Sequence, residues 1–450
     1  MKTNGPKPTS PAARLPKCPT GIQGLDEITG GGLPRGRPTL VCGGAGCGKT
    51  LLAAEFLVRG ALQFGEPGVF MAFEETEAEL KANVASLGFD LAGLVRRKKI
   101  VLDYVHIEPS EVQESGEYDL EGLFVRLNHA IDSIGAKRVV LDSLEALFAS
   151  LTNEAILRAE LRRLFRWLKD KGVTAVITAK RGRDQLTRHG LEEYVSDCVI
   201  VLDHRVYDQI ATRNLRVMKY RGALHGTNEF PFLIGAEGIS VLPITSLGLN
   251  HKVSSERIAT GIPRLDAMLG GRGFFRGSSI LLTGTPGTGK TIIAANFAQA
   301  AGRRGERVLF FSFEESPNQI IRNMHSIGLR LEPLVKRDLL RFHSARPSLY
   351  GLEMHLATMF KEIAAFQPRV VIMDPITSLM DAGTASESKA MVTRLIDYLK
   401  AGQVTSLFTG LAHGGQALRQ TDSAMSSLMD AWLALEDFEG NGEHNRVLYV

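Results

Sequence analysis

The sequence predicts an α/β protein made of two copies of one domain, each with a mostly parallel sheet and helices on both faces. Three observations support this fold class. Apolar, strand-like runs alternate with helical segments, which is typical of parallel strands joined by crossover helices. A set of short motifs occurs twice in the same order. Short apolar runs separated by turn residues follow position 197, and they predict added antiparallel strands at the end of each copy.

The repeat defines the domain organisation. Four motifs return in order at a spacing of about 240 residues, which is too long for a solenoid unit and indicates duplication of a whole domain. The paired motifs are Thr20-Gly21-Ile22 with Thr260-Gly261-Ile262, residues 43–50 with 284–291, Phe73-Glu74-Glu75 with Phe313-Glu314-Glu315, and residues 139–143 with 371–375. We therefore expect a flexible, Pro-rich tail over 1–16, a first domain over 17–247 and a second over 248–450, with a linker near 243–255.

Hydrophobic periodicity predicts the elements of the first copy in order. Residues 38–42 form an apolar strand that leads into a glycine-rich loop, and 49–64 show helical spacing. The later elements are expected as strand 69–73, helix 120–134, strand 139–141, helix 154–171, strand 173–178, and short strands 199–202, 215–220 and 230–234.

Composition excludes several classes of protein. Hydrophobic residues make up 44% of the 450 residues and charged residues 23%, which argues against wholesale disorder. The sequence contains no apolar stretch of about 18 residues, the length needed to span a membrane. The net charge of +4 gives no electrostatic footprint for duplex nucleic acid. The four scattered cysteines indicate free thiols in a reducing compartment, so we expect a cytoplasmic protein.

Each copy carries a run of the form Gly-x-x-x-x-Gly-Lys-Thr between a strand and a helix, at 43–50 and 284–291. The glycines let backbone N–H groups curl around phosphates, the lysine reaches the β- and γ-phosphates, and the hydroxyl binds Mg²⁺. The N-terminus of the following helix adds a favourable dipole. Lys49 with Thr50 and Lys290 with Thr291 fill these roles. Recurrence in the same context argues against a chance Gly-rich turn.

An aspartate ends a neighbouring apolar strand in each copy. Asp142 and Asp374 each follow three apolar residues, where a carboxylate can complete a magnesium site. The alternative is that each aspartate only caps the next helix.

Acidic pairs follow a further strand in each copy, Glu74-Glu75 and Glu314-Glu315. ATP hydrolysis needs a carboxylate that orients and partly deprotonates the attacking water. The carboxyl end of a strand beside the phosphate loop is where such a group should lie. The alternative is that these acids only stabilise a helix N-terminus through its dipole.

A basic cluster lies on and after a late strand of the first copy: Lys219, Tyr220, Arg221 and His225. Taken alone, a solvated and charged edge strand is the favoured interpretation. The other interpretation is a cationic element that reaches the phosphates held by a neighbouring subunit.

Over residues 17–450 the sequence resembles the KaiC family, the doubled RecA-like ATPases of the circadian clock. The resemblance rests on the paired phosphate loops, the Phe-Glu-Glu motifs, the strand-end aspartates, and Thr-Gly-Ile followed by Leu-Asp. Two features are more specific. One is Lys219-Tyr220-Arg221-Gly222 followed by His225-Gly226-Thr227. The other is residues 420–427, which are similar to the family's autophosphorylation segment and place Ser426 and Ser427 on its two hydroxyl positions.

The resemblance implies two tandem RecA-like P-loop NTPase domains that form a homohexamer, with ATPase activity in the first domain and Ser/Thr autokinase activity in the second. It implies that Lys219, Tyr220, Arg221 and His225 act on the nucleotide of the adjacent subunit. It also implies KaiB-like and KaiA-like regulatory partners, ATP or ADP with Mg²⁺ as cofactors, and no role for DNA. The other residues expected to bind ATP are Gly44, Ala45, Gly46, Cys47, Gly48, Lys49, Thr50, Leu51, Ser86, Thr285, Pro286, Gly287, Thr288, Gly289, Lys290, Thr291 and Ile292.

The sequence departs from the family pattern in two ways. The second hydroxyl of the autophosphorylation segment is usually Thr and here is Ser427. The second copy stops at Val450, before any counterpart of Lys219-Tyr220-Arg221. We therefore expect the second domain to lack its C-terminal strand and tail, and the native chain to continue. Two other classes stay open: a RecA-type recombinase or helicase that uses ATP on single-stranded DNA, and a nucleotide-gated interaction module without turnover.

Overall fold

The computed structural model describes residues 15–105, 120–147, 154–182, 195–207, 210–242, 253–349, 351–380, 383–412, 426–440 and 443–450. The chain divides into two compact units. The first comprises Met1–Val206 and Thr212–Thr245, and the second comprises Ser246–Val450 with the short segment Tyr207–Ala211.

The first unit is built on a nine-stranded sheet in the order β11-β10-β9-β8-β3-β7-β6-β4-β5. The strands from β8 to β5 pair in parallel, whereas β10 pairs antiparallel with β9 and β11. The elements are β1 (Lys17–Cys18), α1 (Leu25–Ile28), β2 (Leu33–Pro34), β3 (Pro38–Gly43), α2 (Lys49–Gln63), β4 (Gly68–Ala72), α3 (Glu77–Ala85), α4 (Leu91–Arg96), β5 (Ile100–Tyr104), α6 (Glu121–Ile134), β6 (Arg138–Asp142), α7 (Leu144–Leu147), α8 (Glu154–Asp170), β7 (Thr174–Lys180), β8 (Cys198–Tyr207), β9 (Ile210–Tyr220), β10 (Glu229–Gly235) and β11 (Gly238–Val241).

The second unit repeats this plan with a seven-stranded sheet in the order β16-β15-β17-β18-β14-β19-β20. All pairs are parallel except β19 with β20. The elements are β12 (Arg257–Ile258), α10 (Pro263–Met268), β13 (Phe274–Phe275), β14 (Ser279–Gly284), α11 (Lys290–Arg303), β15 (Val308–Ser312), α12 (Pro317–Ser326), α13 (Glu332–Lys336), β16 (Leu340–Ser344), the short 3₁₀ helix Pro347–Leu349, α14 (Leu352–Phe366), β17 (Val370–Asp374), α15 (Ile376–Met380), α16 (Ala385–Ala401), β18 (Thr405–Leu411), β19 (Ala431–Gly440) and β20 (Glu443–Tyr449).

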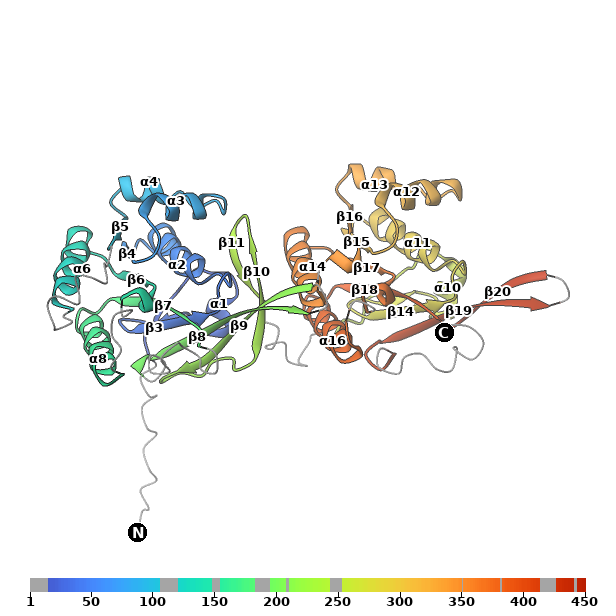
Figure 1. The fold of residues 1–450 in the computed structure, drawn as a ribbon. Helices are drawn as coiled ribbons and strands as arrows, with labels where there is room; N and C mark the ends of the chain where they lie inside the picture. The colour runs from blue at the N-terminus through green and yellow to red at the C-terminus, as the bar shows by residue number, and fades with distance from the viewer. Residues whose placement is uncertain are drawn as a thin grey trace, which may run out of the picture. The chain divides into compact units, whose positions relative to one another are not determined.

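Helices cover both faces of the first sheet, as the sequence predicts (Figure 1). Side chains alternate between the faces of a strand, so Val41 of β3 enters one core and Leu40 the other. The core around Val41 includes Phe56 of α2, and the core around Leu40 includes Phe165 of α8. The predicted class, a mostly parallel sheet with added antiparallel strands, is confirmed.

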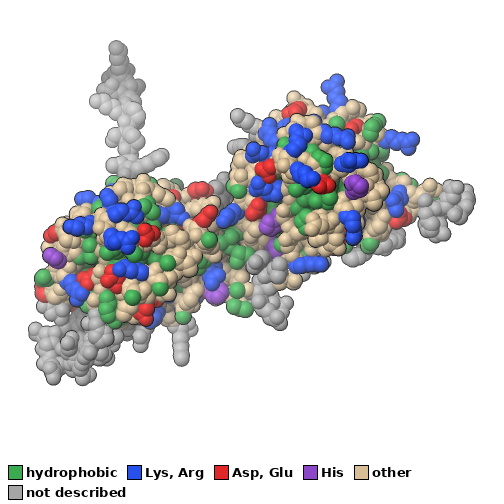
Figure 2. Space-filling view, turned by 90° about the horizontal axis from the view of Figure 1, so that it is seen from above, with side chains coloured by type: hydrophobic (Ala, Val, Ile, Leu, Met, Phe, Trp, Pro, Cys, Tyr) green, Lys and Arg blue, Asp and Glu red, His purple; other side chains and the backbone are tan. Residues whose placement is uncertain are grey.

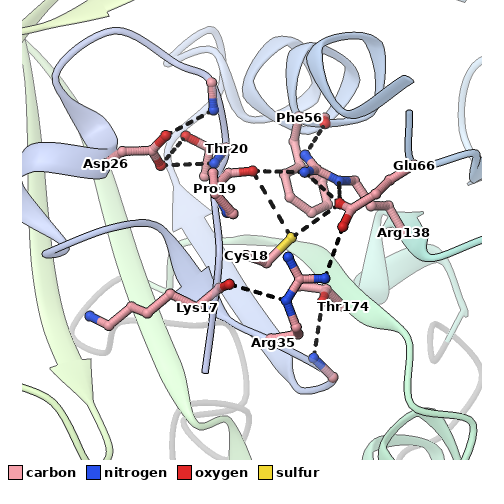
Figure 3. A network of polar contacts seen from close by, with 12 residues as sticks. Lys17, Cys18, Pro19, Thr20, Asp26, Arg35, Phe56, Glu66, Arg138 and Thr174 are labelled. Carbon is pink, nitrogen blue, oxygen red and sulfur yellow. Dashed lines mark hydrogen bonds and ion pairs between the residues drawn. The ribbon is translucent and has the colours of Figure 1, made fainter. Parts of the chain in front are cut away.

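A buried ion pair joins the N-terminal segment to the first residue of β6, at the amino-terminal end of that strand (Figure 3). Arg138 is fully buried, and its guanidinium donates to Glu66 at 2.7 Å, to the Phe56 carbonyl at 2.8 Å and to the Pro19 carbonyl at 2.7 Å. Arg35 donates to the second oxygen of Glu66 at 2.8 Å. Every strong contact of the guanidinium is thus made to an oxygen, which is what permits a charge to be buried.

Charge is mixed on the outer surface. On the face of the first unit shown in Figure 2, Lys and Arg side chains are interspersed with Asp and Glu. No helix in the part of the chain that the structure describes is long and apolar enough to cross a membrane.

Candidate active sites

Each phosphate loop joins a central strand to a long helix, β3 to α2 and β14 to α11. Gly46 and Gly48 have φ of 69° and 99°, in the left-handed region that favours glycine. Gly287 and Gly289 repeat this pattern with φ of 83° and 101°. A side chain at Gly43 would meet the Leu202 carbonyl oxygen at 2.3 Å, so close packing against β8 also requires glycine there.

The two helices leave their N-termini free for an anion. The N-cap residues of α2 and α11 are Gly48 and Gly289, neither of which offers a side-chain cap, and neither helix has an acid in its first turn. By contrast, α3 is closed by a capping box between Thr76 and Glu79. The N–H groups of an uncapped helix start and its positive dipole end attract phosphate.

The loop lysines fold back onto their own loops. Lys49 Nζ donates to the carbonyls of Gly43 at 3.0 Å and Gly44 at 2.7 Å. Lys290 Nζ makes the same two contacts, with Gly284 at 2.8 Å and Thr285 at 2.7 Å. Burial lowers the pKa of Lys290, and the nearby charges of Asp374 and Glu314 oppose that shift. Both ammonium groups are thereby held beside the helix N-terminus that would receive a phosphate.

Asp142 and Asp374 end the strands β6 and β17 and are almost completely buried. Asp142 is hydrogen-bonded by Thr178 of β7 and by Thr50 of the phosphate loop, and Asp374 by Thr409 and Thr291. Burial raises the pKa of both carboxyls, against these hydrogen bonds.

This hydroxyl–carboxylate pair is a suitable but incomplete set of oxygen ligands for Mg²⁺. The described residues hold no group of three or more His, Cys, Asp or Glu side chains that could bind a metal ion. Nucleotide phosphates and water would have to supply the remaining ligands, as they commonly do for Mg²⁺.

Each glutamate pair divides between two environments. Glu74 Oε1 accepts from Ser143 Oγ at 2.9 Å and from Lys180 Nζ at 2.7 Å, whereas Glu75 accepts from Asn83 of α3 at 3.2 Å. In the second unit Glu314 accepts from Ser378 at 2.5 Å, and Glu315 accepts from Asn323 of α12 at 3.3 Å. The first glutamate of each pair therefore faces the aspartate strand, and the second faces the following helix.

Burial opposes ionisation of Glu74, but hydrogen bonds from Lys180 and Ser143 and the charges of Lys180 and Lys49 lower its pKa. Glu74 is therefore held as a carboxylate near the phosphate loop. A carboxylate in this place can accept a proton from a bound water.

Two other expected ATP-binding residues differ in their surroundings. Cys47 is buried inside the phosphate loop, and burial raises the pKa of its thiol. Ser86 is exposed at the C-cap of α3, where its hydroxyl donates to the Asn83 carbonyl at 3.2 Å. The structure therefore brings Ser86 to the α3 end rather than into the loop itself.

The basic cluster lies at the end of β9. It is at the edge of the sheet formed by the amino-terminal ends of the parallel strands, opposite to the carboxyl-terminal edge that carries its own phosphate loop. The Arg221 N–H donates to the Asp197 carbonyl at 2.8 Å, just before β8, and the first residue of β8 pairs with Thr39 at the start of β3. The phosphate loop follows Gly43 at the other end of β3. Four strand residues separate the two levels, which is about 13 Å. Lys219 and Arg221 therefore lie at the opposite end of the strands from the loop of their own unit.

Tyr220 of this cluster is a core residue. Its hydroxyl donates to the Gly32 carbonyl at 2.9 Å, its ring stacks on His225 with centroids 6.1 Å apart, and burial raises its pKa. Within this unit Tyr220 therefore anchors the strand end that carries the two cations.

Ser426 and Ser427 also lie at the edge opposite to the loop of their own unit. Asp430 exchanges hydrogen bonds of 2.8 Å with Ser279, the first residue of β14, and the phosphate loop follows the last residue, Gly284. Five strand residues correspond to about 16 Å. Ser427 is exposed. The rest of the predicted acceptor segment, residues 420–425, lies outside the described residues, as do residues 1–14 of the tail.

Sequence reasoning missed the residues that orient the acids. Lys180, Ser143 and Ser378 contact the inner glutamates, and Thr178 and Thr409 contact the aspartates. Only the two threonines left a signal, because they occupy matching places in β7 and β18, the strands that flank the phosphate-loop strands.

Two phosphate loops, each beside a buried aspartate and an inner glutamate, define a tandem P-loop NTPase. Comparison with known proteins is more specific. A family model for the KaiC ATPase matches residues 18–246 and 258–450. The chain therefore belongs to the KaiC family of ATPases, which confirms the resemblance predicted from the motifs and disfavours the recombinase or helicase alternative.

Individual relatives match almost the whole chain. It is 58% identical over 443 residues to the circadian clock protein KaiC2 of Synechocystis, a match that covers 98% of this chain and 78% of the relative. It is 37% identical over 442 residues to the circadian clock oscillator protein KaiC of Prochlorococcus marinus, covering 97% and 88%. The oscillator protein KaiC of Synechococcus elongatus is 37% identical over 450 residues, covering 99% and 86%.

Proposed function

We propose that this ATPase works as a homohexameric ring in a circadian clock or timer. The first domain hydrolyses ATP, and the second transfers the γ-phosphoryl group to Ser426 or Ser427. The observation that carries the proposal is the opposite-edge placement described above. In each unit the phosphate loop lies at one edge of the sheet, and the candidate trans-acting cations or acceptor hydroxyls lie at the other.

In the first domain Lys49 and the free N-terminus of α2 bind the phosphates. Thr50 and Asp142 would hold Mg²⁺, which neutralises charge on the phosphates when it is bound. Glu74 orients a water for attack and accepts its proton at the carboxylate. We disfavour the alternative of a nucleotide-gated module without turnover, because Ser143 and Lys180 orient Glu74 and its pKa is lowered, which supports a role as proton acceptor.

In the second domain Lys290, Thr291 and Asp374 occupy the corresponding places. Glu314 accepts the proton of a serine hydroxyl, and phosphoryl transfer needs chiefly positioning and charge neutralisation, so one scaffold can use water or serine as acceptor. Ser426 and Ser427 lie toward the end of β14 that is away from the loop of their own unit, which supports transfer between subunits.

A head-to-tail contact between the opposite edges of successive subunits forms a ring when the rotation from one subunit to the next brings the last subunit back to the first. Lys219 and Arg221 would then stabilise the nucleotide held by the neighbouring first domain. The relatives are named as circadian clock proteins, which supports work together with other clock components. KaiA-like and KaiB-like partners are proposed from the family resemblance, and a cytoplasmic location from the free cysteines.

One experiment tests the proposal. The full chain is incubated with Mg-ATP, its native mass is measured by mass spectrometry, and phosphopeptides are mapped in wild type, Ser426→Ala, Ser427→Ala and Glu314→Gln. We expect a hexamer that carries phosphate on Ser426 or Ser427, and no phosphate in the Glu314→Gln variant. Phosphate on neither serine in an intact hexamer would reduce the function to ATP hydrolysis alone.

A further inference from the structure

Lys180 occupies a distinctive place at the end of β7. It pairs in register with Gly43, the last residue of β3 before the phosphate loop. Strand β7 lies between β3 and β6, the strand that ends at Asp142. The lysine side chain therefore leaves the sheet between the phosphate loop and the candidate magnesium ligand. Its Nζ lies 2.7 Å from Glu74 Oε1.

Two donors hold the same oxygen of Glu74. Ser143 Oγ and Lys180 Nζ both donate to Oε1, so neither occupies Oε2. A carboxylate fixed through one oxygen has a defined orientation for the other. The pair is about half exposed, with 53% of the lysine side chain and 43% of the glutamate side chain accessible, so it contributes little to folding.

Among the described residues of the second unit, no cation occupies the place that corresponds to Lys180. Its β18 pairs with β14 so that Leu411 lies opposite Gly284, in the place where Lys180 lies opposite Gly43. Glu314 accepts from Ser378, and the described residues include no Lys or Arg in a salt bridge with it. Within the parts of the two copies that the structure describes, the inner glutamates thus differ by one ammonium group.

We propose that Lys180 is a positioning residue that fixes Glu74 with Oε2 presented to the attacking water, and that it thereby specialises the first domain for hydrolysis. This inference rests on the proposed role of Glu74 as the proton acceptor. In the second domain, where Leu411 replaces the lysine, the inner glutamate keeps more freedom and can serve a serine hydroxyl.

The contact should also be visible in the pH dependence. The charged groups that face Glu74 are Lys180 on β7, Lys49 at the start of α2 and Asp142 at the end of β6. Loss of Lys180 removes hydrogen bonding and charge that lower the carboxyl pKa, so the pKa rises. Because the base must be ionised, turnover is lost as pH falls through this pKa. The acid limb of the rate profile should therefore move to higher pH.

The test uses the full chain with Lys290→Ala, so that turnover reports the first domain. In this background Lys180→Met should lower kcat about tenfold or more, with KM within about twofold, since misorientation of a base affects the transition state more than substrate binding. Its acid limb should move to higher pH. Lys180→Arg keeps a cation in place and should recover most of kcat.

Two controls separate the possible failures. Lys81→Met breaks a comparable 2.6 Å ion pair with Glu77 on α3 and should change neither kcat nor the acid limb. Glu74→Gln tests the proposed function: if it retains turnover, the assignment of the base fails. If Glu74→Gln loses turnover but Lys180→Met keeps both kcat and acid limb, or only melts at lower temperature, the role of Lys180 is overturned and the proposed function stands.

Discussion

The two members of each glutamate pair are adjacent in sequence but belong to different parts of the structure. Glu74 and Glu314 contact serines that follow the aspartate strands, while Glu75 and Glu315 contact an asparagine of the next helix. The division is the same in both units. Because the two acids of a pair lie in different surroundings, we expect them to do different work.

Substitution of the two first-domain acids should separate their roles. In the Lys290→Ala background, Glu74→Gln should reduce ATP turnover about 10²-fold while nucleotide still binds, because general-base help is usually worth that much. Glu75→Gln keeps a group that can bond Asn83 and should reduce turnover by less. The measurement is steady-state phosphate release. An equal loss of turnover in both variants would indicate that the two acids share one role.

Replacement of the loop lysines should have local effects. Lys49→Ala should abolish one class of nucleotide site and Lys290→Ala the other, each with a loss of about 2–4 kcal/mol in binding, since each removes a charged contact to phosphate. Calorimetric titration with a non-hydrolysable ATP analogue gives the stoichiometry. Full stoichiometry and affinity in either variant would exclude that loop as a phosphate site.

At the level of single residues, the sequence predicts those that recur in both copies. Lysines, aspartates and glutamates could be found because the same chemistry stands twice at the same spacing. Lys180 could not, because its counterpart is Leu411 and its role depends on a strand register that only the folded sheet reveals.

Among the predicted elements, the strands β8 and β9 extend furthest beyond their predicted ranges. The apolar runs 199–202 and 215–220 are only parts of Cys198–Tyr207 and Ile210–Tyr220. Beyond Leu202 the strand β8 passes the end of β3 and carries Asp203 and Arg205, and Arg205 pairs with both Asp203 and Glu229. A strand that leaves the core has polar residues on both faces, so hydrophobic periodicity cannot find it.

The ion pair between Glu66 and Arg138, the first residue of β6, supports a prediction about stability in acid. Burial opposes ionisation of Glu66, but hydrogen bonds and charges from Arg35 and Arg138 lower its pKa. A depressed carboxyl pKa stabilises the fold above the unfolded value, and this contribution is lost as pH falls through the folded value. The first domain should therefore lose stability below about pH 4.5, near the unfolded pKa of a glutamate.

Glu66→Gln tests this contribution. The variant should lose about 2 kcal/mol at pH 7, because it leaves the buried Arg138 with weaker compensation, and its stability should vary less with pH. Urea unfolding can be followed by Trp167, after Trp432→Phe has removed the other tryptophan. A variant as acid-sensitive as the wild type would place the acid-labile group elsewhere.

Across the whole molecule, the duplication and its doubly covered sheets could be predicted, because periodicity and repeat both survive in the sequence. The opposite-edge arrangement could not, since it depends on which strand lies beside which and in which direction. It bears directly on the proposed contacts between subunits.

Mixed assemblies provide the test. Subunits with Lys219→Ala and Arg221→Ala should disable the first-domain site of a neighbour and spare their own Lys49 site. When they are mixed with Lys49→Ala subunits, hydrolysis should partly recover, because some contacts then join an intact loop to intact cations. Phosphate release is measured against the mixing ratio. Activity that equals the weighted mean of the two parents at every ratio would rule out action in trans.

The opposite edges also set a rule of stoichiometry. If every complete site needs the loop edge of one subunit and the cation edge of the next, then a single subunit owns two half-sites and no whole one. An open row of subunits holds one site fewer than it has members, and only closure of the row supplies the last. Turnover per chain should therefore fall steeply on dilution and saturate when rings close, so that the population of closed rings sets the rate.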